Sequence, residues 1–398
     1  MTVRVLDYAG DGTYYLEDPA LELERLREGP VGRVLSGPPA PAGRAVRALL
    51  GAPSELGPRA LDVIVAAPKP VSLLLATEPS ATARCVVALH ERAVAATFDY
   101  LLDDARRRAG SATRELPAVG FTHGVNRLLD PHLHTHVLVA AREADGAPVN
   151  GRLLRWRAAS ADALYLAALR EGLPSAAGRA AWLGRSGATL VEGVDLGLVA
   201  AMTTPRSRDG RLERGGAKQH PSGEAVRAHW DAQVASGEDL GLVSSPPPRT
   251  TAIDEYRFAA ALGSGRVGPA DVVRAWGAAC TFGERPERLR RAAALAAPEL
   301  RGGSRRPAVV VADAAGVRVL GARPLDLGAL ADWRAGREAL ARYLGAGHRL
   351  HHLEDLRGAS AATRLAIAAL DVELAARRLG PDRARGTLQP GTVARELS

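Results

Sequence analysis

The chain has 398 residues, of which 46% are hydrophobic and 24% are charged. This length suits two or three domains with their own cores, and the hydrophobic content excludes an intrinsically disordered protein. The net charge of +8 favours a polyanionic partner. The two cysteines, Cys85 and Cys280, lie far apart in the sequence, which argues against a disulfide framework and against a cysteine-based metal site.

The composition also bears on where the protein works. The first residues lack the charged, apolar and small-residue pattern of a signal sequence. The chain contains no run of about 18 apolar residues, the length that a membrane-spanning helix needs. We therefore expect a soluble, cytoplasmic protein without a membrane span.

The start of the chain predicts two strands with a pair of tyrosines between them. Residues 1–9 alternate apolar and polar side chains, which is typical of a strand, and a glycine-rich turn ends the pattern before Tyr14 and Tyr15. Residues 59–66 are apolar and β-branched and predict a buried strand. The carboxylate of Asp62 in this strand is costly to bury unless it has a partner. The alternative is that Asp62 meets solvent at the start of the strand.

Helices are predicted on both sides of a histidine-rich segment. Residues 80–108 carry apolar side chains at helical spacing and predict a long amphipathic helix packed on a sheet. Residues 155–171 predict another helix. Gly172 and Pro174 predict a break after it, and residues 175–183 predict a second, shorter helix.

A proline-rich segment predicts the division of the chain into two domains. Residues 244–250 include three consecutive prolines, so we place the domains at residues 1–245 and 246–398. The second domain is predicted to be mostly helical, with a β-hairpin and no assigned function. The further predicted elements are a strand at 188–192, helices at 222–237, 253–262, 269–280, 285–297, 325–343 and 360–378, and hairpin strands at 307–313 and 317–322.

Four of the ten histidines lie within residues 120–141, at positions His123, His132, His134 and His136. Residues 133–141 predict a strand, and because strand side chains alternate between faces, His132, His134 and His136 point the same way. His123 ends the preceding β-rich run at residues 116–122. Pairing of the two runs brings its imidazole beside the others.

This clustering favours a metal site over ordinary surface or packed histidines. A single strand histidine is usually structural, but three in five residues with a fourth nearby are unusual in a chain with ten histidines. Three neutral imidazoles with open coordination positions are typical of a catalytic rather than a structural metal centre. Three imidazoles suit Mn²⁺, Zn²⁺ or Ni²⁺, while Mg²⁺ prefers oxygen ligands.

Two segments resemble a known family. His123, Asp130-Pro131 and Leu133-His134-Thr135-His136 are similar to the histidine motif of MobF-type conjugative relaxases, the TrwC and TraI family within the HUH endonucleases. Ala67-Pro68-Lys69-Pro70-Val71-Ser72 resembles the turn that follows an aspartate-bearing strand in that family. The resemblance covers roughly residues 1 to 240. It implies an α+β fold in which an antiparallel sheet of the HUH relaxase type is flanked by helices.

The resemblance also implies roles for individual residues. It implies that His123, His134 and His136 bind a divalent ion, with Mg²⁺ or Mn²⁺ expected and Zn²⁺ or Ni²⁺ as alternatives, whereas His132 stands where the family has a non-ligand polar residue. Asp62 is expected to orient a ligand histidine or to help draw the proton from a tyrosine. Arg127 falls where the family places an arginine near the DNA backbone. Lys69 is either a phosphate contact or a plain exposed turn lysine.

The reaction implied by the family is metal-dependent, site- and strand-specific nicking and rejoining of DNA, as in plasmid or mobile-element transfer. It proceeds through a 5′-phosphotyrosine intermediate, with Tyr14 as the expected nucleophile and Tyr15 as its neighbour or substitute. The implied partners are single-stranded DNA at an origin-like site and accessory transfer proteins. A second tyrosine pair, which many members carry, is absent from residues 17–35, which favours a single cycle of cleavage and rejoining. The chain also lacks the phosphate-binding loop of a helicase motor.

Two other functions remain open at this point. One is a DNA-binding protein of the same fold that no longer cleaves DNA, as the missing second tyrosine pair permits. The other is a three-histidine metal hydrolase of a small substrate. The hydrolase needs no DNA and predicts no salt-sensitive DNA binding.

Overall fold

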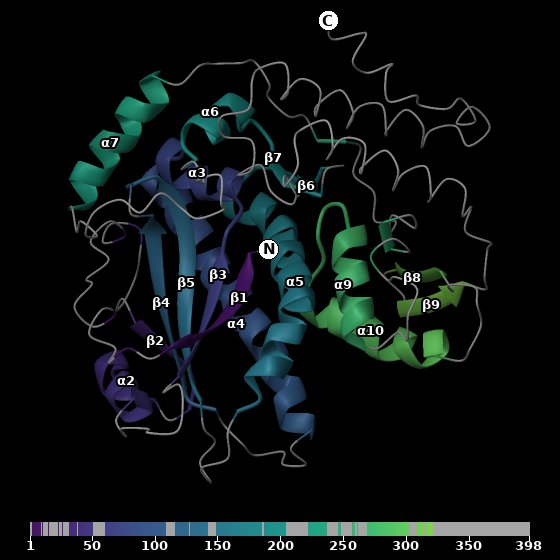
Figure 1. Ribbon diagram of the computed structural model, residues 1–398. Coiled ribbons are helices and arrows are strands. Elements are labelled where there is room, and N and C mark those ends of the chain that lie inside the picture. Colours follow the sequence, from purple (N-terminus) through teal and green to yellow (C-terminus); the bar gives the residue numbers. More distant parts are fainter. Residues whose placement is uncertain are drawn as a thin grey trace, which may run out of the picture.

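A five-stranded antiparallel sheet forms the centre of the protein (Figure 1). The strands run in the order β1-β3-β5-β4-β2 across the sheet. Their bounds are β1 (Val3–Tyr8), β2 (Gly32–Ser36), β3 (Ala60–Ala66), β4 (Ala118–Val125) and β5 (Pro131–Ala140). The computed structural model describes residues 2–8, 10, 15, 23, 26, 32–37, 39–50, 60–108, 116–126, 128–141, 149–184, 187–203, 222–236, 246–247, 257–258, 261, 269–301, 309–313 and 316–320.

Strand β5 lies in the middle of the sheet, and its register positions the histidines. It pairs with β3, where Ile64 lies opposite His136, and with β4, where His123 lies opposite His134. The strands predicted at residues 1–9, 59–66, 116–122 and 133–141 are thus confirmed. One detail differs: β4 continues past His123 to Val125, with a shift in register after His123.

Helices α3 (Lys69–Thr77), α4 (Ser80–Arg108) and α5 (Gly151–Ala177) share one large core with one face of the sheet. The helix predicted at residues 80–108 is therefore confirmed. Val63, Val65, Val137 and Val139 are buried on this face, where their removal from water stabilises the layer. Among the described helices, α2 (Ala42–Leu50) packs on the opposite face.

Helix α5 is continuous through the positions where a break was predicted. The prediction of a separate helix at residues 175–183 is wrong, because α5 runs to Ala177 and ends at Gly178, whose φ of +66° suits a glycine. A Cβ on Gly172 would lie 2.4 Å from Leu89, so this glycine permits close packing of α5 on α4 instead of ending the helix. Residues Ala181–Leu183 form β6, which pairs with β7 (Thr189–Val191), the strand predicted at 188–192.

The helices after the sheet region extend the same core. The bounds are α6 (Leu196–Ala201), α7 (Gly223–Ser236), α9 (Pro269–Ala279) and α10 (Pro286–Arg301), followed by the hairpin β8 (Val309–Asp313) and β9 (Gly316–Leu320). The predicted helices at 222–237, 269–280 and 285–297 and the hairpin are confirmed. The helices predicted at 325–343 and 360–378, and most of 253–262, lie outside the described residues.

Helix α9 packs directly on α5, the helix that covers the sheet. Trp276 of α9 is fully buried in the core shared with α4 and α5. The buried guanidinium of Arg170 donates hydrogen bonds to the carbonyls of Gly277 (2.8 Å) and Cys280 (3.2 Å). The division at residues 245/246 therefore stays a prediction, and α9 shares its core with the preceding part. In the part of the chain that the structure describes, no helix is long and apolar enough to cross a membrane.

Candidate active site on the open face of the sheet

The histidines of β5 lie on the sheet face opposite α4 and α5, which we call the open face. Along β5, His132, His134 and His136 are half-buried, while the alternate residues Leu133, Thr135 and Val137 are fully buried. This alternation is the period-two pattern of a strand with one face in the core. The prediction that the three histidines share a face is confirmed.

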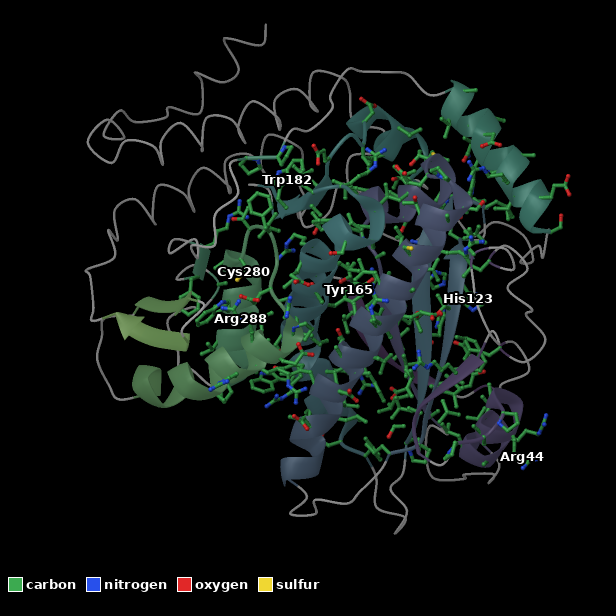
Figure 2. The ribbon with its side chains drawn as sticks, turned by 180° about the vertical axis from the view of Figure 1, so that it is seen from behind. Arg44, His123, Tyr165, Trp182, Cys280 and Arg288 are labelled. Carbon is green, nitrogen blue, oxygen red and sulfur yellow. The ribbon has the colours of Figure 1, made fainter. Side chains whose placement is uncertain are left out.

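His123 reaches the same face from β4 (Figure 2). Its ring stacks on that of His134 across the strands. Its ring centroid lies 5.3 Å from that of His134 and 5.9 Å from that of His136, and the last two rings are 5.3 Å apart. Imidazoles from two strands thus converge, as expected. Within the described residues, no three His, Cys, Asp or Glu side chains already stand in a coordinating arrangement.

Asp62 of β3 holds one of these imidazoles in place. It lies diagonally across from His136, and its Oδ2 and Oδ1 atoms are 2.9 and 3.1 Å from Nδ1 of that ring. The carboxylate is buried, so the expected partner is present and the solvent-facing alternative is wrong. With Nδ1 donating to Asp62, the Nε2 atom of His136 keeps its lone pair for a ligand.

His134 has the same tautomer for a different reason. Its Nδ1 atom donates a hydrogen bond to the backbone carbonyl of His132, at 2.7 Å, which leaves Nε2 as an acceptor. Burial, followed by the neighbouring rings of His132, His136 and His123, holds the pKa of His134 well below its ordinary value. The imidazole is therefore neutral at pH 7, as a metal ligand must be.

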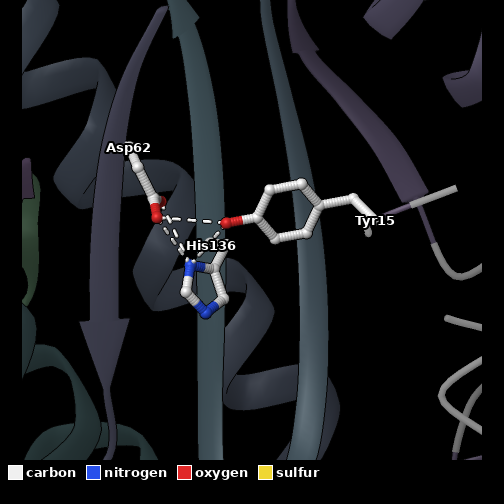
Figure 3. Close-up of polar contacts among 3 residues, drawn as sticks. All are labelled: Tyr15, Asp62 and His136. Carbon is white, nitrogen blue, oxygen red and sulfur yellow. Dashed lines mark hydrogen bonds and ion pairs between the residues drawn. The ribbon is translucent and has the colours of Figure 1, made fainter. Parts of the chain in front are cut away.

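Tyr15 brings a phenol onto the open face (Figure 3). Its ring stacks on Phe121 with centroids 5.1 Å apart, and its hydroxyl donates to Asp62 Oδ2 at 3.1 Å. The same hydroxyl lies 3.1 Å from Nδ1 of His136. Tyr15, the neighbour or substitute in the sequence-based prediction, therefore occupies the site. Tyr14 lies outside the described residues.

The two predicted DNA contacts have different outcomes. Lys69 is buried, with an exposed fraction of 4%, and its ammonium donates to the carbonyl of Pro131 at 2.7 Å. The alternative of a plain exposed lysine is therefore wrong, because this side chain ties the start of α3 to the start of β5. Its contact with phosphate stays a prediction, and Arg127 lies outside the described residues.

His132 belongs to this cluster, although the resemblance to the family excludes it from the expected ligands. Its ring centroid lies 4.7 Å from that of His134. Burial, together with the positive charge of Lys69 and the ring of His136, lowers the pKa of His132 to about 3. The alternation of strand side chains predicts that His132 lies on this face. Only the family pattern, which has a non-ligand polar residue at this position, excludes it from the ligands.

The donor chemistry of these residues suits a divalent ion, whereas their present spacing is slightly too wide for one. Nε2 atoms about 2.1 Å from one ion would place the three ring centroids roughly 5 Å apart, slightly closer than the separations of 5.3 to 5.9 Å. Two of the three imidazoles have their other nitrogen held by a carboxylate or a carbonyl, which is the support that metal-binding histidines usually have.

Comparison with solved structures found conjugative relaxase TrwC bound to oriT DNA. The copper-bound form is 20% identical over 60% of this chain and 99% of the relaxase chain, with a TM-score of 0.47. A metal-bound form is 18% identical over 60% and 99% of the two chains (TM-score 0.43), and a metal-free form is 18% identical over 61% and 100% (TM-score 0.42). A search of the curated proteins found no match.

A family model identifies the central part of the chain. The model of the TrwC relaxase matches residues 50–235. The match includes Asp62 and the four clustered histidines but begins after the tyrosine pair. Residues 50–235 therefore form a relaxase domain of the TrwC type, that is, of the MobF type of DNA relaxase.

Proposed function

We propose that the protein nicks and rejoins one strand of DNA at a specific site through a covalent phosphotyrosine, with Tyr15 as the nucleophile. The single observation that carries this proposal is the contact of the Tyr15 hydroxyl with Asp62 and with the imidazole of His136. A phenol has an ordinary pKa of about 10 and needs a proton acceptor to act at neutral pH. Asp62 is such an acceptor, already within hydrogen-bond distance.

In the proposed reaction the Tyr15 oxygen attacks a backbone phosphorus and the P–O3′ bond breaks. Tyr15 then carries the 5′ phosphate, Asp62 takes the phenolic proton, and the leaving 3′ oxygen takes a proton from solvent. Attack by a 3′ hydroxyl on the phosphotyrosine reverses these steps and rejoins the strand. Stacking on Phe121 holds the phenol in place before the substrate arrives, which lowers the entropic part of the barrier.

We propose His123, His134 and His136 as the ligands of a divalent ion. These residues would hold an ion that, when bound, would polarise the phosphate and stabilise the charge that develops on its oxygens. Neutral imidazoles with supported Nδ1 atoms suit this role. Mg²⁺ and Mn²⁺ are the expected ions, and Zn²⁺ and Ni²⁺ are the alternatives that the three nitrogen donors favour.

The proposed substrate is single-stranded DNA at an origin-like site. The solved TrwC structures are complexes with oriT DNA. The net charge of +8 supports a polyanionic partner. Accessory transfer proteins are proposed as further partners, and the cytoplasm as the compartment.

The test is covalent trapping on DNA. The purified chain is incubated with Mn²⁺ and a pool of single-stranded oligonucleotides, and adducts are located by mass spectrometry of tryptic peptides. We expect an adduct on Tyr15 that persists in Tyr14→Phe and is lost in Tyr15→Phe. An adduct lost only in Tyr14→Phe would assign the nucleophile to Tyr14. DNA binding without any adduct would support a non-cleaving protein, and metal-dependent hydrolysis without DNA would support a small-substrate hydrolase.

A further inference from the structure

Four buried polar side chains form one hydrogen-bonded network on the core side of the sheet. His90 of α4 is in the middle, with Nδ1 2.6 Å from the hydroxyl of Tyr165 and Nε2 2.8 Å from the hydroxyl of Thr135. The hydroxyls of Thr135 and Thr122 lie 2.9 Å apart. The exposed fractions of the four side chains do not exceed 3%. The network thus joins α4, α5, β4 and β5.

This network lies directly behind the proposed metal ligands. Thr135 is the residue between His134 and His136, and Thr122 immediately precedes His123. Because strand side chains alternate, the threonines point into the core while the histidines point to the open face. Each proposed ligand is therefore adjacent in sequence to a threonine of the network. Thr135 is hydrogen-bonded to His90 itself, and Thr122 is hydrogen-bonded to Thr135.

The network is complete as a chain of neutral hydrogen bonds. A neutral imidazole has one donor and one acceptor nitrogen, and hydroxyls can take either role, so both tautomers of His90 satisfy all the contacts. Burial and the nearby carboxylate of Asp162 hold the pKa of Tyr165 well above its ordinary value, so it remains a phenol. A half-satisfied group here would be costly, because water does not reach it.

The surrounding residues show that polarity is not needed for packing at this layer. Leu133 and Val137, the neighbours of Thr135 on the same face of β5, are fully buried apolar side chains. A valine has the shape of threonine and would add apolar burial there. Polar groups in such a place fix one arrangement of the elements, because only one register and orientation satisfies them.

We propose that His90, Thr135, Thr122 and Tyr165 are positioning residues that fix the relative positions of the imidazoles of His123, His134 and His136, the three proposed metal ligands. This inference rests on the proposed function only in treating the three histidines as ligands. The hydrogen bonds hold β4 and β5 against the helices from behind, so the ligands on the open face keep their mutual geometry. Loss of the network lets the two strands shift, which spreads the three rings.

The test compares two Thr→Val substitutions in the same core. Thr135→Val removes the network hydroxyl. The matched control is Thr97→Val, since Thr97 is equally buried, bonds only the Ala93 carbonyl in the hydrogen bonds described for it, and lies about 10 Å further along α4 than His90. Thr135→Ser keeps the hydroxyl, and Tyr165→Phe breaks the network from the α5 side if Thr135→Val does not fold.

Two measurements are needed on each variant. The first is the imidazole ¹⁵N and ¹H chemical shifts of the three histidines in the metal-free protein, and the second is the Kd of Mn²⁺ by calorimetry. For Thr135→Val we expect shifted histidine signals and metal binding weaker by about tenfold, within the range for lost support of metal ligands. Thr135→Ser should restore both, and Thr97→Val should change neither.

The outcomes separate this inference from the proposed function. Histidine signals and Kd values in Thr135→Val and Tyr165→Phe that match those of Thr97→Val would overturn the positioning role. A second outcome is that the histidine signals shift in Thr135→Val while the wild-type protein binds none of Mn²⁺, Mg²⁺, Zn²⁺ and Ni²⁺. That outcome would support the positioning role and overturn the metal-dependent reaction.

Discussion

Asp62 and His136 lie on neighbouring strands, two residues out of direct register, and their closest atoms are 2.9 Å apart. The carboxylate thereby does two things at once. It fixes the tautomer of the imidazole and accepts the hydrogen bond of the Tyr15 phenol. A single buried charge thus connects the proposed nucleophile to the proposed metal site.

Asp62→Asn should weaken both functions of this carboxylate. An amide keeps the shape but lacks the charge that favours proton transfer, so we expect the single-turnover nicking rate to fall by about 10²–10⁴-fold. Affinity for Mn²⁺ should fall by about 10–100-fold, because the amide supports the imidazole less well. Asp7→Asn is the control, since Asp7 of β1 is an exposed carboxylate paired with Arg155 of α5. Equal rates in the two variants would contradict the role of Asp62.

Phe121→Leu should slow adduct formation without preventing it. The substitution keeps an apolar side chain beneath Tyr15 but removes the ring that stacks on it. Such stacking is worth about 1 kcal/mol, which corresponds to a loss of about fivefold in rate. Quenched-flow measurement of the covalent adduct at saturating DNA isolates this step. An unchanged rate would show that stacking does not position the phenol.

Stability of the metal-free protein should fall as the pH is lowered below about 6.5. His132 and His134 are neutral in the folded protein because their pKa values are lowered, to about 3 for His132. Above pH 6.5 the two imidazoles are neutral in both the folded and the unfolded protein, so they do not make the free energy of unfolding depend on pH. Below pH 6.5 the imidazoles of the unfolded chain bind protons and those of the folded chain do not. Each histidine therefore lowers the free energy of unfolding by up to about 1.4 kcal/mol per pH unit, for His132 down to pH 3.

Denaturant unfolding of the metal-free protein at pH 7, 6 and 5 measures this slope. His132→Gln and His134→Gln should each make the dependence shallower. A slope unchanged by either substitution would show that the two imidazoles are protonated in the folded protein.

A chain that ends at residue 245 should be much less stable than one that ends at residue 301. The shorter chain loses Trp276 from the shared core and the carbonyl partners of the buried Arg170 guanidinium. Deletion of a single buried tryptophan costs about 3–5 kcal/mol, so we expect a difference of at least that size in the free energy of unfolding. Equal stabilities would support a domain boundary at 245/246.

The sequence predicted the elements that its periodicity determines. The long helix at residues 80–108 and the strands around Asp62 and the histidines follow from alternation and helical spacing alone. The convergence of His123 on the β5 histidines followed from pairing of consecutive strands. These signals are local, which is why they can be read without the fold.

Other features depend on contacts between distant segments. Gly172 is a breaker by propensity, but its missing side chain accommodates Leu89 of α4, and packing keeps the helix intact. The sequence around Lys69 is typical of an exposed turn, but in the structure α3 places its ammonium against the carbonyl of Pro131. The position of the Tyr15 ring depends on its contact with Phe121, a residue over 100 positions away in the sequence.

Helix α5 carries both Tyr165, behind the histidine strands, and Arg170, which binds the end of α9. The two residues are five positions apart, or about 7.5 Å along the helix axis. One rigid helix thus carries, within two turns, both a residue that holds α9 and a residue that supports the strands of the imidazole cluster.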